Sequence, residues 1–352
     1  MSSISYCVPG TFEENRFEKL HNVPFNSPQA GSIAVADEIA SLIRKKQAKN
    51  EMCVLGLATG SSPITVYKRL IELHKSEGLS FKNVITFNLD EYFGLDTSDI
   101  NSYHLFMHDN LFDHIDILPE NIHIPSGELP LDQVREYCVD YEEKIIAAGG
   151  IDLQLLGIGR TGHVGFNEPG SNINSQTRLV SLDHLTRLDA AEAFQGLDNV
   201  PRKAISMGIK TILSARRIIL LAWGTNKSEI IQRAIEGEVN PNVPSTYLQK
   251  HENTTVVLDH QAASDLIRVK TPWITGNCNW EDDTIRFRAV HWLCQKTKKS
   301  ILKLTEEDYN LNGMSELLIV EGNYYDLNIK MFKRLQNTIT RPHKCSSASE
   351  QM

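Results

Sequence analysis

A histidine and a glutamate lie five residues apart in the segment GIGRTGHVGFNEPGS, residues 157–171. His163 can exchange a proton near neutral pH, and Glu168 can serve as its carboxylate partner. Asp90, which follows the apolar run ITFNL, is a second candidate, because burial raises the pKa of a carboxyl group towards that of a general base. Each also has a structural interpretation: a buried histidine, a turn cap at Glu168, and a helix or turn cap at Asp90. Together the three side chains predict acid–base chemistry.

The segment LATGSSP, residues 57–63, supplies candidates for binding an anion. They share a place just before a helix-like segment: Thr59, Gly60, Ser61 and Ser62. Backbone amides and hydroxyl groups at the start of a helix favour a phosphate group. A plain capped helix is the alternative, with Ser62 as the cap and Pro63 at the first helical position. Lys227, in WGTNK, can complete a phosphate clamp or remain a solvated lysine.

Short apolar runs alternate with helix-like segments in the first 269 residues. Five runs are expected to be buried strands: CVLGLATG, NVITFNLDEY, IDLQLLGIG, RRIILLAWG and TTVVLD. Continuous apolar strands between helices are typical of a parallel sheet that is covered on both faces. The predicted fold class is therefore α/β: an open, doubly wound, Rossmann-like and mostly parallel sheet with helices on both faces.

The polar residues that follow these strands are expected to converge, because ligands of open parallel sheets bind beyond the carboxyl ends of the strands. The loop 59–62, Asp90 with Glu91, the turn GRTGH and Lys227 would then meet at one edge. Acid–base groups beside an anion cradle predict chemistry on a small phosphorylated molecule.

Composition restricts the partners of the chain. Its 352 residues are 41% apolar and 23% charged, and its formal net charge is −8. Because no basic stripe is present, we expect no nucleic acid as a partner. No apolar run approaches the roughly 18 residues that cross a bilayer, and the first residues lack signal-peptide features, so we expect no membrane and a cytoplasmic protein. The six cysteines show no zinc-ligand spacing, and no metal site is expected.

Several motifs resemble the glucosamine-6-phosphate deaminase family. In chain order they are LGLATGSSPITVYKRL, FNLDEYFGL, SYHLFMHDNLFDHIDI, GHVGFNEPGS and WGTNKSEIIQRAIEGEV, within residues 30–268. The resemblance implies isomerising deamination of glucosamine 6-phosphate to fructose 6-phosphate and ammonia, with no metal and no cofactor. It also implies that His163 and Glu168 open the sugar ring, that Asp90 moves a proton between carbons 2 and 1, and that the loop 60–62 and Lys227 hold the phosphate. Members of the family are often hexameric, so a homo-oligomer is one possible state of this chain.

Two positions depart from the pattern of that family. Thr161 stands where the family has an aspartate that orients the imidazole, and a hydroxyl stabilises an imidazolium less than a carboxylate does. We therefore expect reduced or altered activity. Ala191 and Glu192 occupy the neighbourhood of the family's phosphate-binding arginine. Arg178 and Arg187 are the candidates to replace it.

Three segments are expected along the chain. Residues 1–269 form the sugar-phosphate isomerase/deaminase domain, residues 270–340 a helical C-terminal extension, and residues 341–352 a disordered tail. The extension exceeds the compact deaminases and resembles a longer subgroup, in which some relatives continue into a second, deacetylase-like domain. We expect no such domain within these 352 residues.

Two alternative functions fit the same fold. The 6-phosphogluconolactonases resemble it and share a glycine–histidine turn, but NEPGS and NLDEY favour the deaminase branch. A non-catalytic sugar-phosphate sensor is the other alternative, because sensor domains of some bacterial regulators look like this fold, and Thr161 is compatible with lost catalysis. No basic helix-turn-helix segment is evident in the sequence, which counts against a role in transcription.

Overall fold

The computed structural model describes residues 16–276 and 278–339 of the chain. These residues form two compact units: Phe17–Leu266 belong to the first, and Arg16 and the described residues from Ile267 onward belong to the second. The expected disordered tail, residues 341–352, lies outside the described residues.

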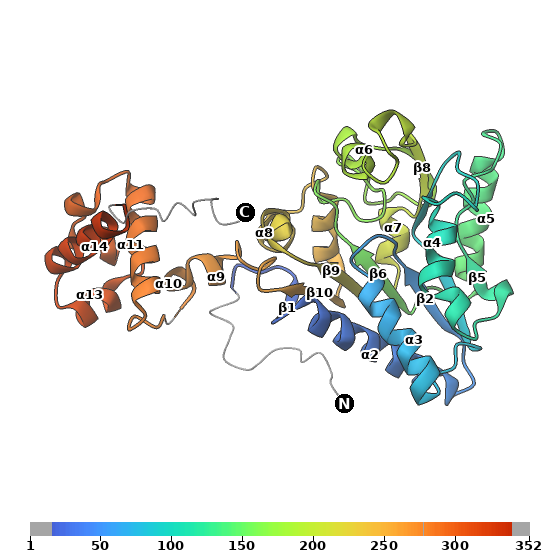
Figure 1. Ribbon diagram of the computed structural model, residues 1–352, viewed down its shortest axis with the longest axis horizontal. Helices are drawn as coiled ribbons and strands as arrows, with labels where there is room; N and C mark the ends of the chain where they lie inside the picture. Colours follow the sequence, from blue (N-terminus) through green and yellow to red (C-terminus); the bar gives the residue numbers. More distant parts are fainter. Residues whose placement is uncertain (1–15, 277, 340–352) are drawn as a thin grey trace, which may run out of the picture. The chain divides into compact units, whose positions relative to one another are not determined.

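A seven-stranded sheet forms the centre of the first unit (Figure 1). Its order is β1-β10-β9-β6-β2-β3-β5, and each neighbouring pair is parallel. In chain order the strands are β1 (His21–Phe25), β2 (Cys53–Leu57), β3 (Val84–Asn88), β5 (Ile122–His123), β6 (Leu153–Gly157), β9 (Ile218–Ala222) and β10 (Thr254–Asp259). The predicted parallel α/β sheet is confirmed.

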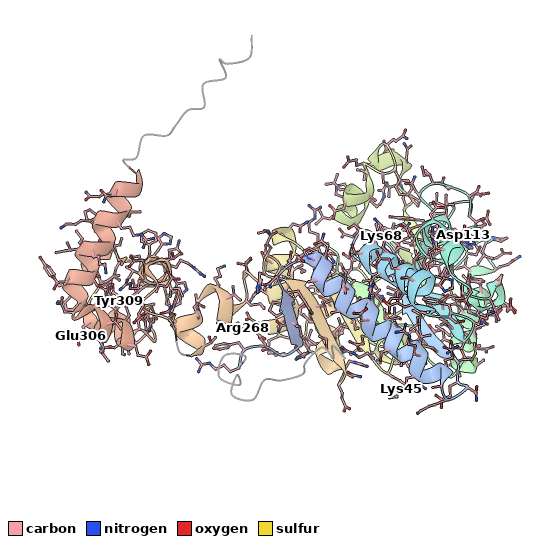
Figure 2. All side chains as sticks on the ribbon, turned by 60° about the horizontal axis from the view of Figure 1, so that its bottom comes forward. Lys45, Lys68, Asp113, Arg268, Glu306 and Tyr309 are labelled. Carbon is pink, nitrogen blue, oxygen red and sulfur yellow. The ribbon has the colours of Figure 1, made fainter. Side chains whose placement is uncertain are left out.

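One face of this sheet is covered by α2 (Pro28–Gln47), α3 (Ile64–Glu77) and α4 (Tyr103–Asn110). Their buried side chains share one hydrophobic core with alternate residues of the central strands, such as Leu55 and Leu57 of β2. Lys45 on α2 and Lys68 on α3, both labelled in Figure 2, are exposed. The two helices are therefore amphipathic, with an apolar side on the sheet and a charged side in solvent.

The other face carries α5 (Val134–Ala147), α7 (Ile209–Leu213) and α8 (Ser228–Glu236). After β5 the chain crosses back through β6, β9 and β10, opposite to the direction from β2 to β5. Because crossovers between parallel strands are right-handed, this reversal places the later helices on the second face. The prediction of helices on both faces is thus confirmed.

The segment NVITFNLDEY forms two strands, so its prediction as a single strand is wrong. Leu89 separates β3 from β4 (Asp90–Tyr92), since its N–H donates to Leu57 O in the large sheet and its carbonyl accepts from Met207 N. β4 belongs to a second, antiparallel sheet of order β4-β8-β7, with β7 (Arg178–Ser181) and β8 (Lys203–Ser206). Asp90 therefore begins a strand of the small sheet.

The predicted cap at Ser62 is also wrong. Helix α3 begins at Ile64 with Pro63 as its N-cap, and no side-chain cap hydrogen bond is found there among the described residues. The carbonyl of Pro63 already accepts from Tyr67 N at 3.0 Å, so the first turn closes one residue later than predicted. Ser62 is therefore a loop residue.

The second unit is helical, as predicted for the C-terminal part of the chain. Its helices are α9 (Ile267–Lys270), α10 (Pro272–Thr275), α11 (Asp283–Thr297), α12 (Glu306–Asn310), α13 (Ser315–Glu321) and α14 (Tyr324–Ile339). Tyr309, labelled in Figure 2, is buried in its core and donates to Asn328 Oδ1 at 2.6 Å, whereas Glu306 on the same helix is exposed. In the described part of both units, no helix is long and apolar enough to span a bilayer.

Candidate active site

The sheet has a topological switch point between β2 and β6. These strands are neighbours, but the chain continues from β2 towards β5 and from β6 towards β1. Diverging connections leave a crevice at the carboxyl ends of such strands, and open α/β sheets bind ligands there. The loop 58–63 follows β2 and the loop 158–168 follows β6, so the predicted cradle and the predicted His163 turn both border this crevice.

Glycine at position 159 makes room for the imidazole of His163. A Cβ atom added to Gly159 would lie only 2.0 Å from His163 Nε2. The turn is closed by two backbone hydrogen bonds, Gly159 N to His163 O and Gly162 N to Gly159 O, both 3.0 Å. Gly162 has φ +82, a left-handed conformation that favours glycine. The glycines thus fold the loop tightly enough to place the ring against the main chain.

Three side chains surround Nδ1 of His163. Glu168 Oε2 lies 3.1 Å from it, Thr161 Oγ1 2.9 Å and Thr186 Oγ1 3.3 Å. Burial raises the pKa of Glu168, but the hydrogen bond and charge of His163, with further hydrogen bonds from Thr186 and the Asp183 amide, hold it below its usual value. The ionised glutamate favours a proton on Nδ1, which leaves Nε2 to exchange protons with a ligand.

Thr161 bridges the pair that the sequence predicts. Besides its contact with His163, its hydroxyl donates to Glu168 Oε2 at 3.4 Å. A threonine can therefore orient the ring as the expected aspartate would, but it adds no negative charge. The side chains of His163 and Glu168 are only 16% and 11% exposed. Solvent therefore does not make up for the negative charge that an aspartate at position 161 would add.

Asp90 is buried, at 6% exposure, and its pKa is raised to about 8 by burial and by the neighbouring charge of Glu91. It pairs with Ser206 of β8, and Ser206 Oγ accepts from Phe166 N at 3.0 Å. A Cβ atom added to Gly165 would lie 3.3 Å from Asp90 Oδ2. The loop that carries His163 and Glu168 therefore passes directly over Asp90.

Glu91 has a different role from its neighbour. Its carboxylate accepts from Ser102 Oγ at 2.8 Å and from the amides of Tyr103 and His104 at 3.1 and 2.9 Å. These groups begin α4, where a negative charge is stabilised. Glu91 thus fixes the start of α4 and, through its charge, contributes to the raised pKa of Asp90.

Tyr103, for which the sequence predicted no role, connects the cradle with Asp90. Burial raises the pKa of its phenol, which also interacts with the side chains of Thr59, Tyr92 and Asp90. Its ring stacks on Phe166, with centroids 6.0 Å apart. The loop after β2 and the loop after β6 therefore contact the same aromatic side chain.

The predicted cradle is an open loop. Thr59 is partly buried, whereas Gly60 and Ser61 are exposed, and Gly60 has φ +89. The carbonyl of Ser62 accepts from Trp223 Nε1 at 3.2 Å, which ties this loop to the one after β9. Lys227 lies in that second loop.

Lys227 reaches the end of β6. Its Nζ donates to Ile158 O at 2.8 Å. Burial lowers the pKa of Lys227, against the opposing influence of Asp189 and with that of Arg160. Contacts thus connect the four segments that were predicted to converge, through Trp223 and Ser62, Lys227 and Ile158, and Gly165 and Asp90. In the described ranges, no three His, Cys, Asp or Glu side chains are grouped to hold a metal ion.

The two arginines proposed as replacements for the missing phosphate ligand are engaged elsewhere. Arg187 Nη2 donates to Leu197 O at 2.7 Å and to Val200 O at 3.2 Å. Arg178 donates through Nη1 to Asn167 Oδ1 at 2.9 Å and through Nη2 to Ser171 Oγ at 3.3 Å. Both guanidinium groups thus hold loops in place.

The chain is similar to one known family and to several known proteins. The family described as glucosamine-6-phosphate isomerases/6-phosphogluconolactonase matches residues 26–257. A putative glucosamine-6-phosphate deaminase-like protein of Bacteroides thetaiotaomicron is 46% identical over 338 residues, which cover 95% of this chain and 51% of that protein. The chain thus spans about half the length of this relative. Glucosamine-6-phosphate deaminase 1 of Bacillus subtilis is 47% identical over 211 residues, 60% of this chain and 86% of its own.

Two solved structures are similar to the chain. The structure of a monomeric glucosamine-6-phosphate deaminase has a TM-score of 0.67 and 43% identity, and it covers 70% of this chain and 100% of its own. A 6-phosphogluconolactonase from Trypanosoma cruzi has a TM-score of 0.58 and 19% identity, with 70% and 97% covered. At that identity the second similarity shows the shared fold alone.

Proposed function

The chain belongs to the glucosamine-6-phosphate isomerase/6-phosphogluconolactonase family, and on this premise we propose that it converts glucosamine 6-phosphate to fructose 6-phosphate and ammonia. The observation that carries the proposal is the position of a buried carboxyl group of raised pKa, Asp90, beneath the loop that holds the His163–Glu168 pair. Such a pairing supplies two separate proton-transfer groups within one crevice.

The first step of the proposed reaction opens the sugar ring. Nε2 of His163 takes the proton of the hydroxyl on carbon 1, the bond between carbon 1 and the ring oxygen breaks, and the ring oxygen takes the proton. The imidazolium that exists between these transfers is stabilised by Glu168 at 3.1 Å from Nδ1. Thr161 orients the ring without adding charge, so we expect slower ring opening than an aspartate there would allow.

The second step moves a proton from carbon 2 to carbon 1. Ionised Asp90 takes the proton from carbon 2, and the electron pair shifts to the carbonyl oxygen. That oxygen takes a proton from the ammonium group on carbon 2, which gives an enolamine. The same carboxyl group returns a proton to carbon 1, which leaves an iminium at carbon 2. Water adds there and ammonia leaves, so that glucosamine 6-phosphate and water give fructose 6-phosphate and ammonia. Because burial favours the neutral form of Asp90, its pKa of about 8 limits the ionised fraction at neutral pH.

The experiment that tests this function measures ammonia release from glucosamine 6-phosphate and galactosamine 6-phosphate, with hydrolysis of 6-phosphogluconolactone measured in parallel. Ammonia from either amino sugar supports the deaminase and identifies the preferred epimer. Lactone hydrolysis without ammonia would assign the chain to the other activity of its family. Saturable binding of the sugar phosphates with no turnover would indicate a sensor, and each of these two results would contradict the proposal.

A further inference from the structure

A further cation, Arg160, lies beside the residues of the candidate site. Arg160 lies three residues beyond β6, directly before Thr161, in the loop that carries His163. Its Nη2 lies 3.0 Å from Asp189 Oδ1 of α6 (His184–Ala190), and each of the two side chains is 49% exposed. A half-exposed ion pair of this kind contributes little to stability, because solvent screens it. The guanidinium of Arg160 therefore remains accessible to a ligand from solvent.

Arg160 and Lys227 belong to one cluster of charges. Lys227 Nζ donates to the carbonyl of Ile158, two residues before Arg160. The pKa of Lys227 is lowered mainly by burial, and Asp189 and Arg160 influence it in opposite directions, which places all three charges around the same end of β6. Two cations thus surround a single, half-exposed carboxylate.

A sugar-phosphate dianion needs more than one cation, and the usual arginine is absent because Ala191 and Glu192 occupy its neighbourhood. Arg178 and Arg187 hold loops, as described above. An arginine binds a phosphate with two parallel N–H donors, whereas the contact between Arg160 Nη2 and Asp189 Oδ1, at 3.0 Å, joins two half-exposed side chains. A phosphate group can therefore displace the aspartate from this guanidinium.

We propose that Arg160 is the second cation of the phosphate site, beside Lys227, and that Asp189 occupies its guanidinium until a phosphate group takes that place. This inference rests on the proposed function for the identity of the substrate. It does not need the reaction itself, because inorganic phosphate can occupy the same two cations.

The test uses variants with opposite expected effects. Arg160→Ala removes a charged, two-donor partner and should raise both the KM for glucosamine 6-phosphate and the Kd for inorganic phosphate by about 10- to 100-fold. Asp189→Ala removes the competing carboxylate and should lower both constants. Arg135→Ala changes an exposed arginine on α5 and should leave them unchanged. If the pair only fastened α6 to the loop, Arg160→Ala and Asp189→Ala would change the constants in the same direction, and that result overturns the inference.

Phosphate binding is measured by calorimetry, separately from turnover. If the wild-type chain releases no ammonia but binds phosphate, and Arg160→Ala weakens that binding, the proposed function fails and the phosphate site stands. If turnover is normal and Arg160→Ala binds phosphate as tightly as the wild type, the inference fails and the function stands. Arg160→Gln keeps the length of the side chain and replaces Arg160→Ala if the alanine variant does not fold.

Discussion

Replacing Asp90 with asparagine should stabilise the folded protein increasingly as pH rises. The carboxyl group is buried, and its pKa is raised from 3.8 to about 8. Between these values the folded state keeps a proton that the unfolded state has released. The free energy of unfolding of the wild type therefore falls with rising pH in this window, whereas a neutral asparagine has no such dependence.

The size of the effect follows from the two pKa values. The interval from 3.8 to about 8 spans about four pH units, and each unit corresponds to about 1.4 kcal/mol. The Asp90→Asn variant should thus gain roughly 6 kcal/mol relative to the wild type across the whole window. Part of this gain is offset where the amide packs less well than the carboxyl group. The quantity to compare is therefore the change with pH of the difference in free energy of unfolding between variant and wild type, and not the absolute value of that difference.

Urea unfolding of the wild type and the variant, at several pH values between about 5 and about 8, measures that change with pH. The difference in free energy of unfolding should grow by about 1.4 kcal/mol per pH unit. Asp140→Asn, on the exposed side of α5, is the matched control and should give a constant difference. A constant difference for Asp90→Asn as well would refute the reasoning, because Asp90 would then be ionised in the folded protein throughout this range.

Three further predictions concern turnover. The rate should rise with pH around a midpoint of about 8, as Asp90 ionises. In a pH–rate profile, Glu91→Gln should move this midpoint to lower pH. An unchanged midpoint would show that the charge of Glu91 does not raise the pKa of Asp90. Thr161→Asp should raise kcat about tenfold, because a charged hydrogen bond replaces a neutral one, and steady-state kinetics that show an unchanged or lower kcat would argue against this role. Gly159→Ala should lower kcat by about 100-fold, since its Cβ atom would lie 2.0 Å from His163 Nε2 and displace the ring; near-normal kinetics would contradict the placement of that ring.

The sequence predicted the central strands well, and the edges poorly. The residues of β2, β9 and β10 are buried throughout, so their continuous apolar runs identify them. Strand β1 was not predicted, because it lies at the sheet edge, contains Pro24 and is mostly half-buried. The break at Leu89 was also missed, because Leu89 and its neighbours Asn88 and Asp90 are all buried. Only the hydrogen-bond partners of Leu89, which are Leu57 in β2 and Met207 directly after β8, reveal the break.

The candidate site was predictable where its residues are close in sequence. His163, Glu168 and Thr161 lie within eight residues, and the structure brings their side chains together. Thr186 approaches the same imidazole from α6, 23 residues away, and no pattern in the sequence pairs the two. The pair of Arg160 and Asp189 is likewise a contact between segments that only the folded chain brings together.

In the proposed reaction, one site both isomerises and deaminates an amino-sugar phosphate, with Asp90 as the base. The most direct measurement quantifies ammonia and fructose 6-phosphate together during turnover of glucosamine 6-phosphate, for the wild type and for Asp90→Asn. We expect equal amounts of ammonia and fructose 6-phosphate from the wild type and neither product from the variant. Equal product formation by both proteins, or fructose 6-phosphate without ammonia, would contradict the proposed reaction.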